Sequence, residues 1–197
     1  MESNVIDAAA LAGSVTKPYQ QQEKDLPQFS THLSYLFGPE LIVGASAYLG
    51  PYLHEAATTD PVPEGKSFED YDNGGIGYDL YFARGYFEFN SEAYYSWWEY
   101  PTLPDLGATV GYVESKYKFA VGWHVAGRFG WFEPSEVNVA NGDRHRWDYS
   151  VNRYEVGIGH QFTRSVQTKL VGQFNRFKGA PSLNSDIVAL QLSVSVD

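Results

Sequence analysis

The sequence contains no cysteine and one methionine in 197 residues. Without cysteine there are no disulfide bonds, no thiolate metal sites and no cysteine nucleophile. Basic residues are also scarce, with 14 Lys and Arg against 24 Asp and Glu, a formal net charge of −10. Such a chain lacks the clustered cations that bind nucleic-acid backbones, so nucleic acid is excluded as the main partner. HExxH, GxSxG and Gly-rich phosphate motifs are missing as well, and we therefore predict no enzyme activity, no catalytic residue, no metal and no cofactor.

Long hydrophobic runs are also missing. No segment approaches the ~18 consecutive apolar residues of a membrane-spanning helix. The N-terminal stretch MESNVIDAAALAGSV has no basic residue and is interrupted by Asp7, so it is not predicted to be a signal peptide. We expect residues 1–27 to form an N-terminal segment with a weak strand at 8–16. Residues 28–197 are expected to form a single domain.

Apolar and polar residues alternate with a period of two along most of the chain. In IVALQLSVSV (187–196), for example, every second residue is Val or Leu. This alternation gives a strand one apolar face, and no window shows a comparable helical stripe, so the sequence predicts an all-β protein. A change of phase within 147–162 predicts a β-bulge near Asn152. The expected strands are 28–37, 41–53, 75–84, 86–99, 107–118, 121–132, 147–162, 166–177 and 186–196.

Short and long connections alternate between these strands. The long ones fall at about 54–74, 100–106, 133–146 and 178–185. Strict alternation is typical of an up-and-down sheet with two different ends, as in outer-membrane barrels with short periplasmic turns and long external loops. Most strands are also as long as the ~9–11 residues that a tilted membrane strand needs. We therefore predict an antiparallel up-and-down transmembrane β-barrel. The acidic segment 54–74 is interpreted as a solvated loop, with cation binding near lipopolysaccharide as the alternative.

The 32 aromatic residues concentrate near strand ends, which is typical of the girdles at the two membrane interfaces. A soluble core filled by the same rings is the alternative. The girdle candidates are Trp97, Trp98, Trp131 and Trp147 toward the long loops, and Phe119, Trp123 and Phe162 toward the short turns.

The two faces of the strands predict two environments. The apolar face is expected to contact lipid and includes Val188, Leu190, Leu192, Val194, Val156 and Ile158. The polar face is expected to line a lumen, because a Lys or Arg facing lipid at mid-depth costs ~2–4 kcal/mol. Its charged candidates are Arg128, Arg153, Lys169, Lys116, Lys118, Glu88, Glu92, Glu114, Glu155 and Asp79. We expect these charges to pair across the wall; in the alternative arrangement Arg128, Arg153 and Lys169 form a basic track that selects anions.

Several of these strands resemble the C-terminal half of Gram-negative porins, and most closely the superfamily of the phosphate-selective porins O and P. The ordered matches are Gly44/Ser46/Tyr48, Glu92, Ala126/Arg128, and Arg153/Glu155 followed by Lys169. The likeness covers about 28–197. It implies location in the outer membrane, contact with its lipid and lipopolysaccharide, a homotrimer, and passive diffusion of small polar or anionic solutes. A porin has ~16–18 strands, so the nine or ten found here would be part of one.

Two features depart from that family. Its barrels usually end on an aromatic residue, whereas this chain ends Val196-Asp197. Together with the lack of a signal peptide, this predicts a shortened chain, and a stand-alone barrel of ten strands is the alternative. Two other functions stay open: a soluble β-sandwich that binds carbohydrate through exposed aromatics, and a barrel enzyme that uses His160 near the rim.

Overall fold

Long strands make up most of the computed structural model, which describes residues 27–53, 61–138 and 144–195. The expected strand at 8–16 lies outside these ranges. No helix within them has the length and hydropathy needed to cross a membrane. A two-stranded ribbon of β7 (Glu136–Asn138) and β8 (Arg144–Arg146) and two 3-10 helices, η2 (Phe68–Asp70) and η3 (Pro181–Leu183), lie in the connections. The long strands are β1 (Phe29–Phe37), β2 (Leu41–Pro51), β3 (Asp72–Arg84), β4 (Phe87–Trp98), β5 (Leu106–Ala120), β6 (Trp123–Pro134), β9 (Val151–Gln161), β10 (Val166–Phe177) and β11 (Ser185–Val194).

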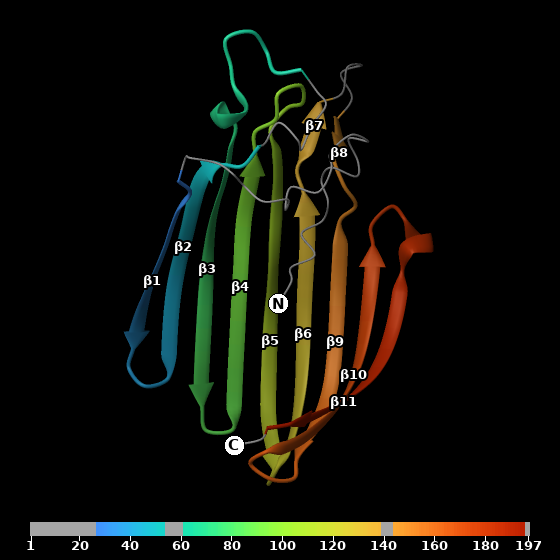
Figure 1. Ribbon diagram of the computed structural model, residues 1–197. Coiled ribbons are helices and arrows are strands. Elements are labelled where there is room, and N and C mark those ends of the chain that lie inside the picture. The colour runs from blue at the N-terminus through green and yellow to red at the C-terminus, as the bar shows by residue number, and fades with distance from the viewer. Residues whose placement is uncertain (1–26, 54–60, 139–143, 196–197) are drawn as a thin grey trace.

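The nine long strands form one antiparallel up-and-down sheet, as the sequence predicts. Their order is β1-β2-β3-β4-β5-β6-β9-β10-β11, so each long strand pairs with its neighbours along the chain (Figure 1). Three of the short turns contain a glycine with positive φ: Gly38 at 68°, Gly85 at 61° and Gly122 at 76°. Glycine adopts this backbone conformation without the steric penalty of a Cβ atom, which explains how these chain reversals stay so short.

The sheet is curved but open, and this differs from the predicted closed barrel. Among the described residues, β1 pairs only with β2 and β11 only with β10. The strands also form one extended layer (Figure 1), whereas a β-sandwich needs two sheets packed face to face. The sandwich of the alternative hypothesis is therefore not present in the described part of the chain.

Strand bounds differ from the sequence prediction mainly around 133–162. The expected loop 133–146 contains the β7–β8 ribbon, and β9 begins at Val151 rather than at residue 147. The predicted bulge near Asn152 is wrong, because the pairing of β6 with β9 is regular from Phe132↔Val151 onward. The phase changes because Trp147 and Tyr149 precede the strand. An irregularity occurs instead between Tyr117 and Ala120.

All but one of the buried apolar residues of the described structure lie in two clusters at the long-loop end of the sheet; the exception is Ala180. One consists of Leu53, Tyr71 and Tyr100, and the other of Leu106, Ala108 and Trp147. Trp98 and Phe132 pack edge-on against Trp147, with 6.1 Å between ring centroids in each pair. The Trp147 indole N–H also donates a 2.6 Å hydrogen bond to the carbonyl oxygen of Gly107. These contacts fix the connection before β9 against β5.

We expect Trp147→Ala to destabilise this connection by about 3–5 kcal/mol, the usual cost of removing a buried aromatic side chain. Trp147 is only 8% exposed, and the variant also leaves the Gly107 carbonyl without its indole donor. Limited proteolysis of the protein in detergent micelles should then cleave within 144–150 at a lower protease concentration. Tyr149→Ala is the matched control, because Tyr149 is 48% exposed; equal sensitivity of the two variants would contradict the anchoring role.

Candidate functional site

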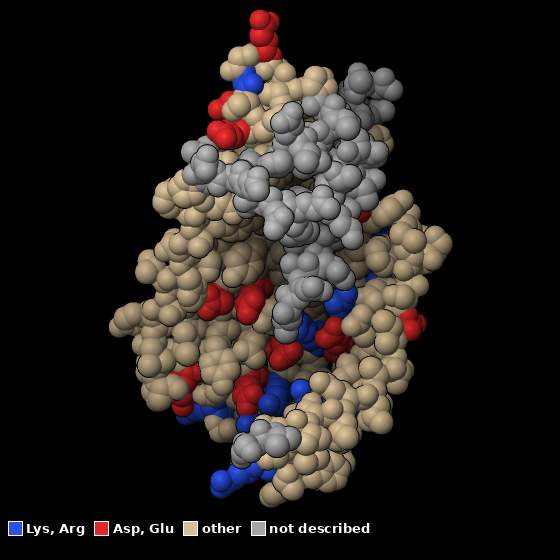
Figure 2. Space-filling view, viewed as in Figure 1, with Lys and Arg blue, Asp and Glu red and all other residues tan. Residues whose placement is uncertain are grey.

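One face of the sheet carries all ten charged residues that the sequence assigns to a lumen. Strand pairing places them together: Asp79 lies opposite Glu92, Glu92 opposite Tyr112, and Arg153 opposite Asn175. Figure 2 shows acidic and basic side chains gathered in the hollow of the sheet. With five acids and five bases, this inner face has a formal charge of zero.

The charges separate along the strands. The two cross-strand rows toward the long loops hold four acids, Asp79, Glu92, Glu114 and Glu155, and two arginines, Arg128 and Arg153, a net charge of −2. Toward the short turns, Glu88 faces Lys116, with Lys118 and Lys169 beyond, a net charge of +2. A solute crossing this face would therefore meet an acidic zone and then a basic zone.

Three of the acids contact an inward cation or tyrosine. Glu88 binds both Lys116 and Lys118, at 3.2 Å and 2.5 Å. Arg128 lies 3.9 Å from Glu114, and its guanidinium stacks 3.7 Å above the ring of Tyr112. The Tyr112 hydroxyl donates a 2.9 Å hydrogen bond to Glu92. For these residues the geometry follows the paired arrangement rather than a free basic track.

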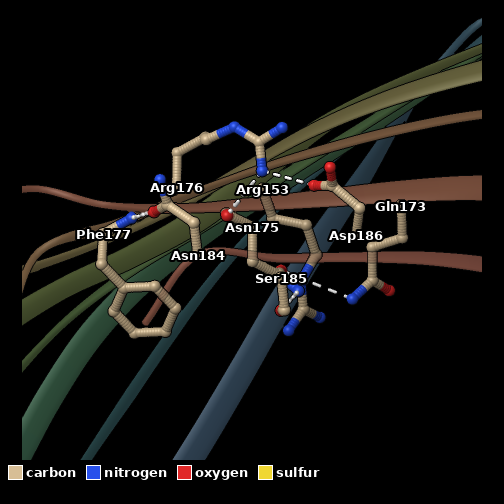
Figure 3. Close-up of polar contacts among 8 residues, drawn as sticks. All are labelled: Arg153, Gln173, Asn175, Arg176, Phe177, Asn184, Ser185 and Asp186. Carbon is tan, nitrogen blue, oxygen red and sulfur yellow. Dashed lines mark hydrogen bonds and ion pairs between the residues drawn. The ribbon is translucent and has the colours of Figure 1, made fainter. Parts of the chain in front are cut away.

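Arg153 is held differently, by a network of neutral side chains. Its Nε donates a 2.9 Å hydrogen bond to Oδ1 of Asn175, and the Asn175 amide donates to Ser185 at 2.9 Å (Figure 3). Asn175 is only 6% exposed, so this anchor is rigid. In the described part of the chain, neither Arg153 nor Lys169 forms an ion pair with a carboxylate. Sequence alternation places Asn175 on this face, but its supporting role depends on contacts between three strands that no local pattern encodes.

At the β1 side of the same face, His32 and Asp79 approach each other across β2. His32 Nε2 lies 2.9 Å from Oδ1 of Asp79, above Gly44. A Cβ atom at Gly44 would lie 2.3 Å from that carboxylate oxygen, so a larger residue there would displace the Asp79 and His32 side chains from this contact. Within the described ranges, no three His, Asp or Glu side chains come together as a metal site.

The outer face is mostly apolar and carries no charged residue along the middle of any long strand of the described sheet. The residues predicted to contact lipid, Val188, Leu190, Leu192, Val194, Val156 and Ile158, all lie on it and are exposed. In the described sheet, the outward charged residues lie within one residue of a strand end; they are Asp72, Arg84, Glu133, Arg176 and Asp186. Contact of this face with lipid stays a prediction. Such contact requires that the middle of the face carry no charge, and the outward charges of the described sheet lie at the strand ends.

Aromatic residues of the outer face gather at both ends of the strands. Trp97 stacks with Tyr95, and Trp131 with Phe129, toward the long loops. Phe119, Trp123 and Phe162 lie toward the short turns, with His160 between Trp123 and Phe162 at centroid distances of 4.4 Å. His160 thus packs between aromatic rings, with Thr168 opposite it on β10, and its Nδ1 atom has no hydrogen-bond partner in the described part of the chain.

Trp98 and Trp147 are exceptions to the girdle prediction. Both belong to the cluster with Leu106 and Ala108, and Trp98 lies opposite Leu106 on the inner face. Their girdle assignment is therefore wrong. Position near a strand end did not distinguish these two residues from the girdle residues. Trp98 lies on the opposite face of β4 from Trp97, and Trp147 lies in the connection before β9.

Ion pairs join the long connections at the rim. Glu133 of β6 binds Arg146 of β8 and also Lys178, which follows β10, at 3.1 Å. The Arg146 guanidinium donates to the hydroxyl of the buried Ser150 at 2.6 Å. Arg176 pairs with Asp186 at 2.5 Å across β10 and β11 (Figure 3). Of the expected acidic loop, residues 54–60 lie outside the described part; Glu64, Glu69 and Asp70 are exposed, as a solvated loop requires.

We predict a small pH dependence at Asp148, in the connection before β9. Burial raises the pKa of Asp148 above its ordinary value, so the folded state favours the neutral carboxyl group. Its contribution to stability is full at low pH and is lost as the pH rises through the raised pKa. Asp148→Asn retains the acceptor for the Tyr149 backbone N–H. The variant should have a higher Tm than the wild type at pH 7.5 and a smaller advantage at pH 4; an equal advantage at both would contradict the assignment.

Comparisons with known proteins bear on the fold alone. No protein-family model matches the chain, and no curated protein sequence does either. Among solved structures it is similar to OmpT, an outer membrane protein of Vibrio cholerae that was folded in vitro. The TM-score is 0.56 at 12% identity, over 86% of this chain and 52% of OmpT. The chain thus shares the strand architecture of this outer membrane protein and spans about half its length.

Proposed function

We propose that the chain forms part of the wall of an outer-membrane channel, through which small polar or anionic solutes diffuse passively. The observation that carries this proposal is the division of charge between the two faces. Ten charged residues lie on the inner face, whereas the outer face has none away from strand ends in the described sheet. Such a division is what a wall between lipid and a water-filled lumen needs. The likeness to an outer membrane protein agrees with it.

The proposed channel performs no covalent chemistry, and its selectivity depends on the inner face. Glu88 and Glu114 are already paired with cations, which reduces their effect on a passing ion. Arg153, fixed by Asn175, presents the remaining guanidinium N–H groups to the lumen, where carboxylate or phosphate groups are suitable acceptors. We therefore propose a weak preference for anions. A relation to the phosphate-selective porin superfamily, with its homotrimer, is part of this proposal.

Planar-bilayer recordings of the refolded protein test the proposal directly. We expect discrete conductance steps and, under a salt gradient, a reversal potential that indicates weak anion preference. A protein that is β-rich and monomeric in buffer without detergent, and that produces no conductance, would contradict both membrane location and transport. Lipopolysaccharide in the bilayer should not be required for conductance, because the inner face carries the proposed selectivity.

A further inference from the structure

Two tyrosine rings lie against the backbone of β3 on the inner face. At its inward positions toward the long loops, β3 has glycine at residues 75 and 77. Tyr48 of β2 covers Gly75, because a Cβ atom there would lie 2.4 Å from Cε1 of the ring. Tyr94 of β4 covers Gly77 in the same way, with its Cδ1 2.3 Å from the Cβ position. The two glycines thus make room for the rings of Tyr48 and Tyr94, which we call the tyrosine platform.

The platform is held in place and stays partly exposed. The Tyr48 hydroxyl donates a 3.0 Å hydrogen bond to Ser96, which lies opposite Gly75. Both rings belong to half-buried residues, and the Tyr94 hydroxyl has no hydrogen-bond partner in the described part of the chain. The glycines under the rings are two residues apart, ~7 Å along the strand. The lumen side of β3 therefore offers two adjacent aromatic surfaces.

Two carboxylates border the platform. Asp79 is the next inward residue of β3 after Gly77, and Glu92 lies opposite it on β4. Figure 2 shows acidic side chains in this part of the hollow, over β3 and β4. Asp79 contacts His32, and Glu92 accepts the hydrogen bond from Tyr112. Among the described residues, neither carboxylate is paired with a lysine or an arginine.

The chain binds one of its own cations with the same combination of groups, on the neighbouring strands. The guanidinium of Arg128 lies 3.7 Å above the ring of Tyr112 and 3.9 Å from the carboxylate of Glu114. The face of an aromatic ring is electronegative and attracts a cation, and a nearby carboxylate adds to the attraction. The tyrosine platform has rings and carboxylates too, but within the described ranges no cation lies over Tyr48 or Tyr94.

We propose that the tyrosine platform, together with Asp79 and Glu92, binds the guanidinium or ammonium group of a small organic solute. A neutral saccharide can also stack on aromatic rings, but two carboxylates without a basic partner favour a cation. This inference names one class of small polar solute for the channel proposed above, and it rests on that function for its role in transport. The weak preference for anions depends on Arg153 of β9, three strands away from β4 in the sheet.

Saturation-transfer NMR of the refolded protein in detergent micelles tests the site, with methylguanidinium as the probe. N-methylurea is the matched control ligand, because it has nearly the same shape and no charge. We expect methylguanidinium to bind roughly tenfold more tightly than N-methylurea, and glucose not to displace it. Equal binding of the two ligands would overturn the cation site. Displacement of the probe by glucose would overturn it in favour of a saccharide site.

Substitutions locate the binding on the platform. Tyr94→Leu removes one ring and should weaken methylguanidinium binding by roughly threefold or more. Tyr94→Phe should restore the binding, because the ring and not the hydroxyl contacts the cation. Gly77→Ala keeps every ring and charge but displaces the Tyr94 ring, and it should weaken binding as Tyr94→Leu does. Gly130→Ala is the matched control on the inner face of β6, where the nearest atom is 3.6 Å from the Cβ position.

The outcomes separate this site from the proposed channel. If Tyr94→Leu and Gly77→Ala bind methylguanidinium like Gly130→Ala, the tyrosine platform is not the binding site. Far-UV circular dichroism identifies a variant that has not folded; the comparison of Tyr94→Leu with Tyr94→Phe then decides, because neither adds an atom next to Gly77. Bilayer recordings use the same preparation. Conductance without methylguanidinium binding overturns the cation site only, whereas binding without conductance overturns the channel and leaves the site.

Discussion

Val156→Arg is expected to prevent insertion of the sheet into a lipid bilayer. Val156 lies at the middle of β9 on the outer face, is 59% exposed, and is paired on both sides. An arginine at mid-depth against lipid costs ~2–4 kcal/mol, a large part of the ~5–15 kcal/mol that keeps a typical protein folded. Flotation of the refolded protein with liposomes on a density gradient measures the loss.

The structure offers close controls for this substitution. The residues opposite Val156 on both neighbouring strands are Gly127 and Gly172, so a longer side chain meets no bulky cross-strand neighbour. Val156→Met should therefore float like the wild type, which separates size from charge. Gln173→Arg adds the same charge on the inner face, opposite Glu155, and should also float normally. Equal flotation of Val156→Arg and Gln173→Arg would mean that the outer face does not contact lipid.

The assignment of residues to faces was predictable from sequence because strand geometry is local. Side chains alternate between faces with a period of two, so a single register places Leu190 and Leu192 on one face and Lys169 on the other. The order of the strands was also predictable, since short glycine turns such as those at Gly38 and Gly85 force adjacent strands to pair. These two local rules account for the up-and-down sheet and for its charged inner face.

Packing between distant segments was not predictable in the same way. The sequence pattern includes Trp147 in a strand at 147–162, but the residue is buried against Leu106 and Ala108 and lies in the connection before β9. The hydrogen bonds that fix Arg153 join β9 to β10 and β10 to β11, between residues 22 and 10 positions apart. Closure of the barrel is likewise non-local, because an alternating pattern specifies the two faces of a strand and not the number of strands around the wall.

Arg153→Glu is the substitution expected to change ion selectivity most. The change moves the charge of the inner face from zero to −2 at a position where no carboxylate of the described structure neutralises the arginine. We expect the preference for anions over cations to fall by roughly a factor of two to ten, since salt screens a lumen charge beyond ~8–10 Å. The reversal potential of single channels under a tenfold KCl gradient gives this ratio.

Arg176→Glu is the matched control, because it makes the same change of charge one residue along the neighbouring strand from Asn175, which lies opposite Arg153, but on the opposite face of the sheet. Arg176 pairs with Asp186 outside the lumen, so its replacement should leave the reversal potential unchanged. Asn175→Ala provides an intermediate case. It keeps the Arg153 charge but removes the acceptor that orients it, so selectivity should weaken without reversing. If Arg153→Glu and Arg176→Glu shift the potential equally, the inner face does not control selectivity, and the charge at the rim as a whole does.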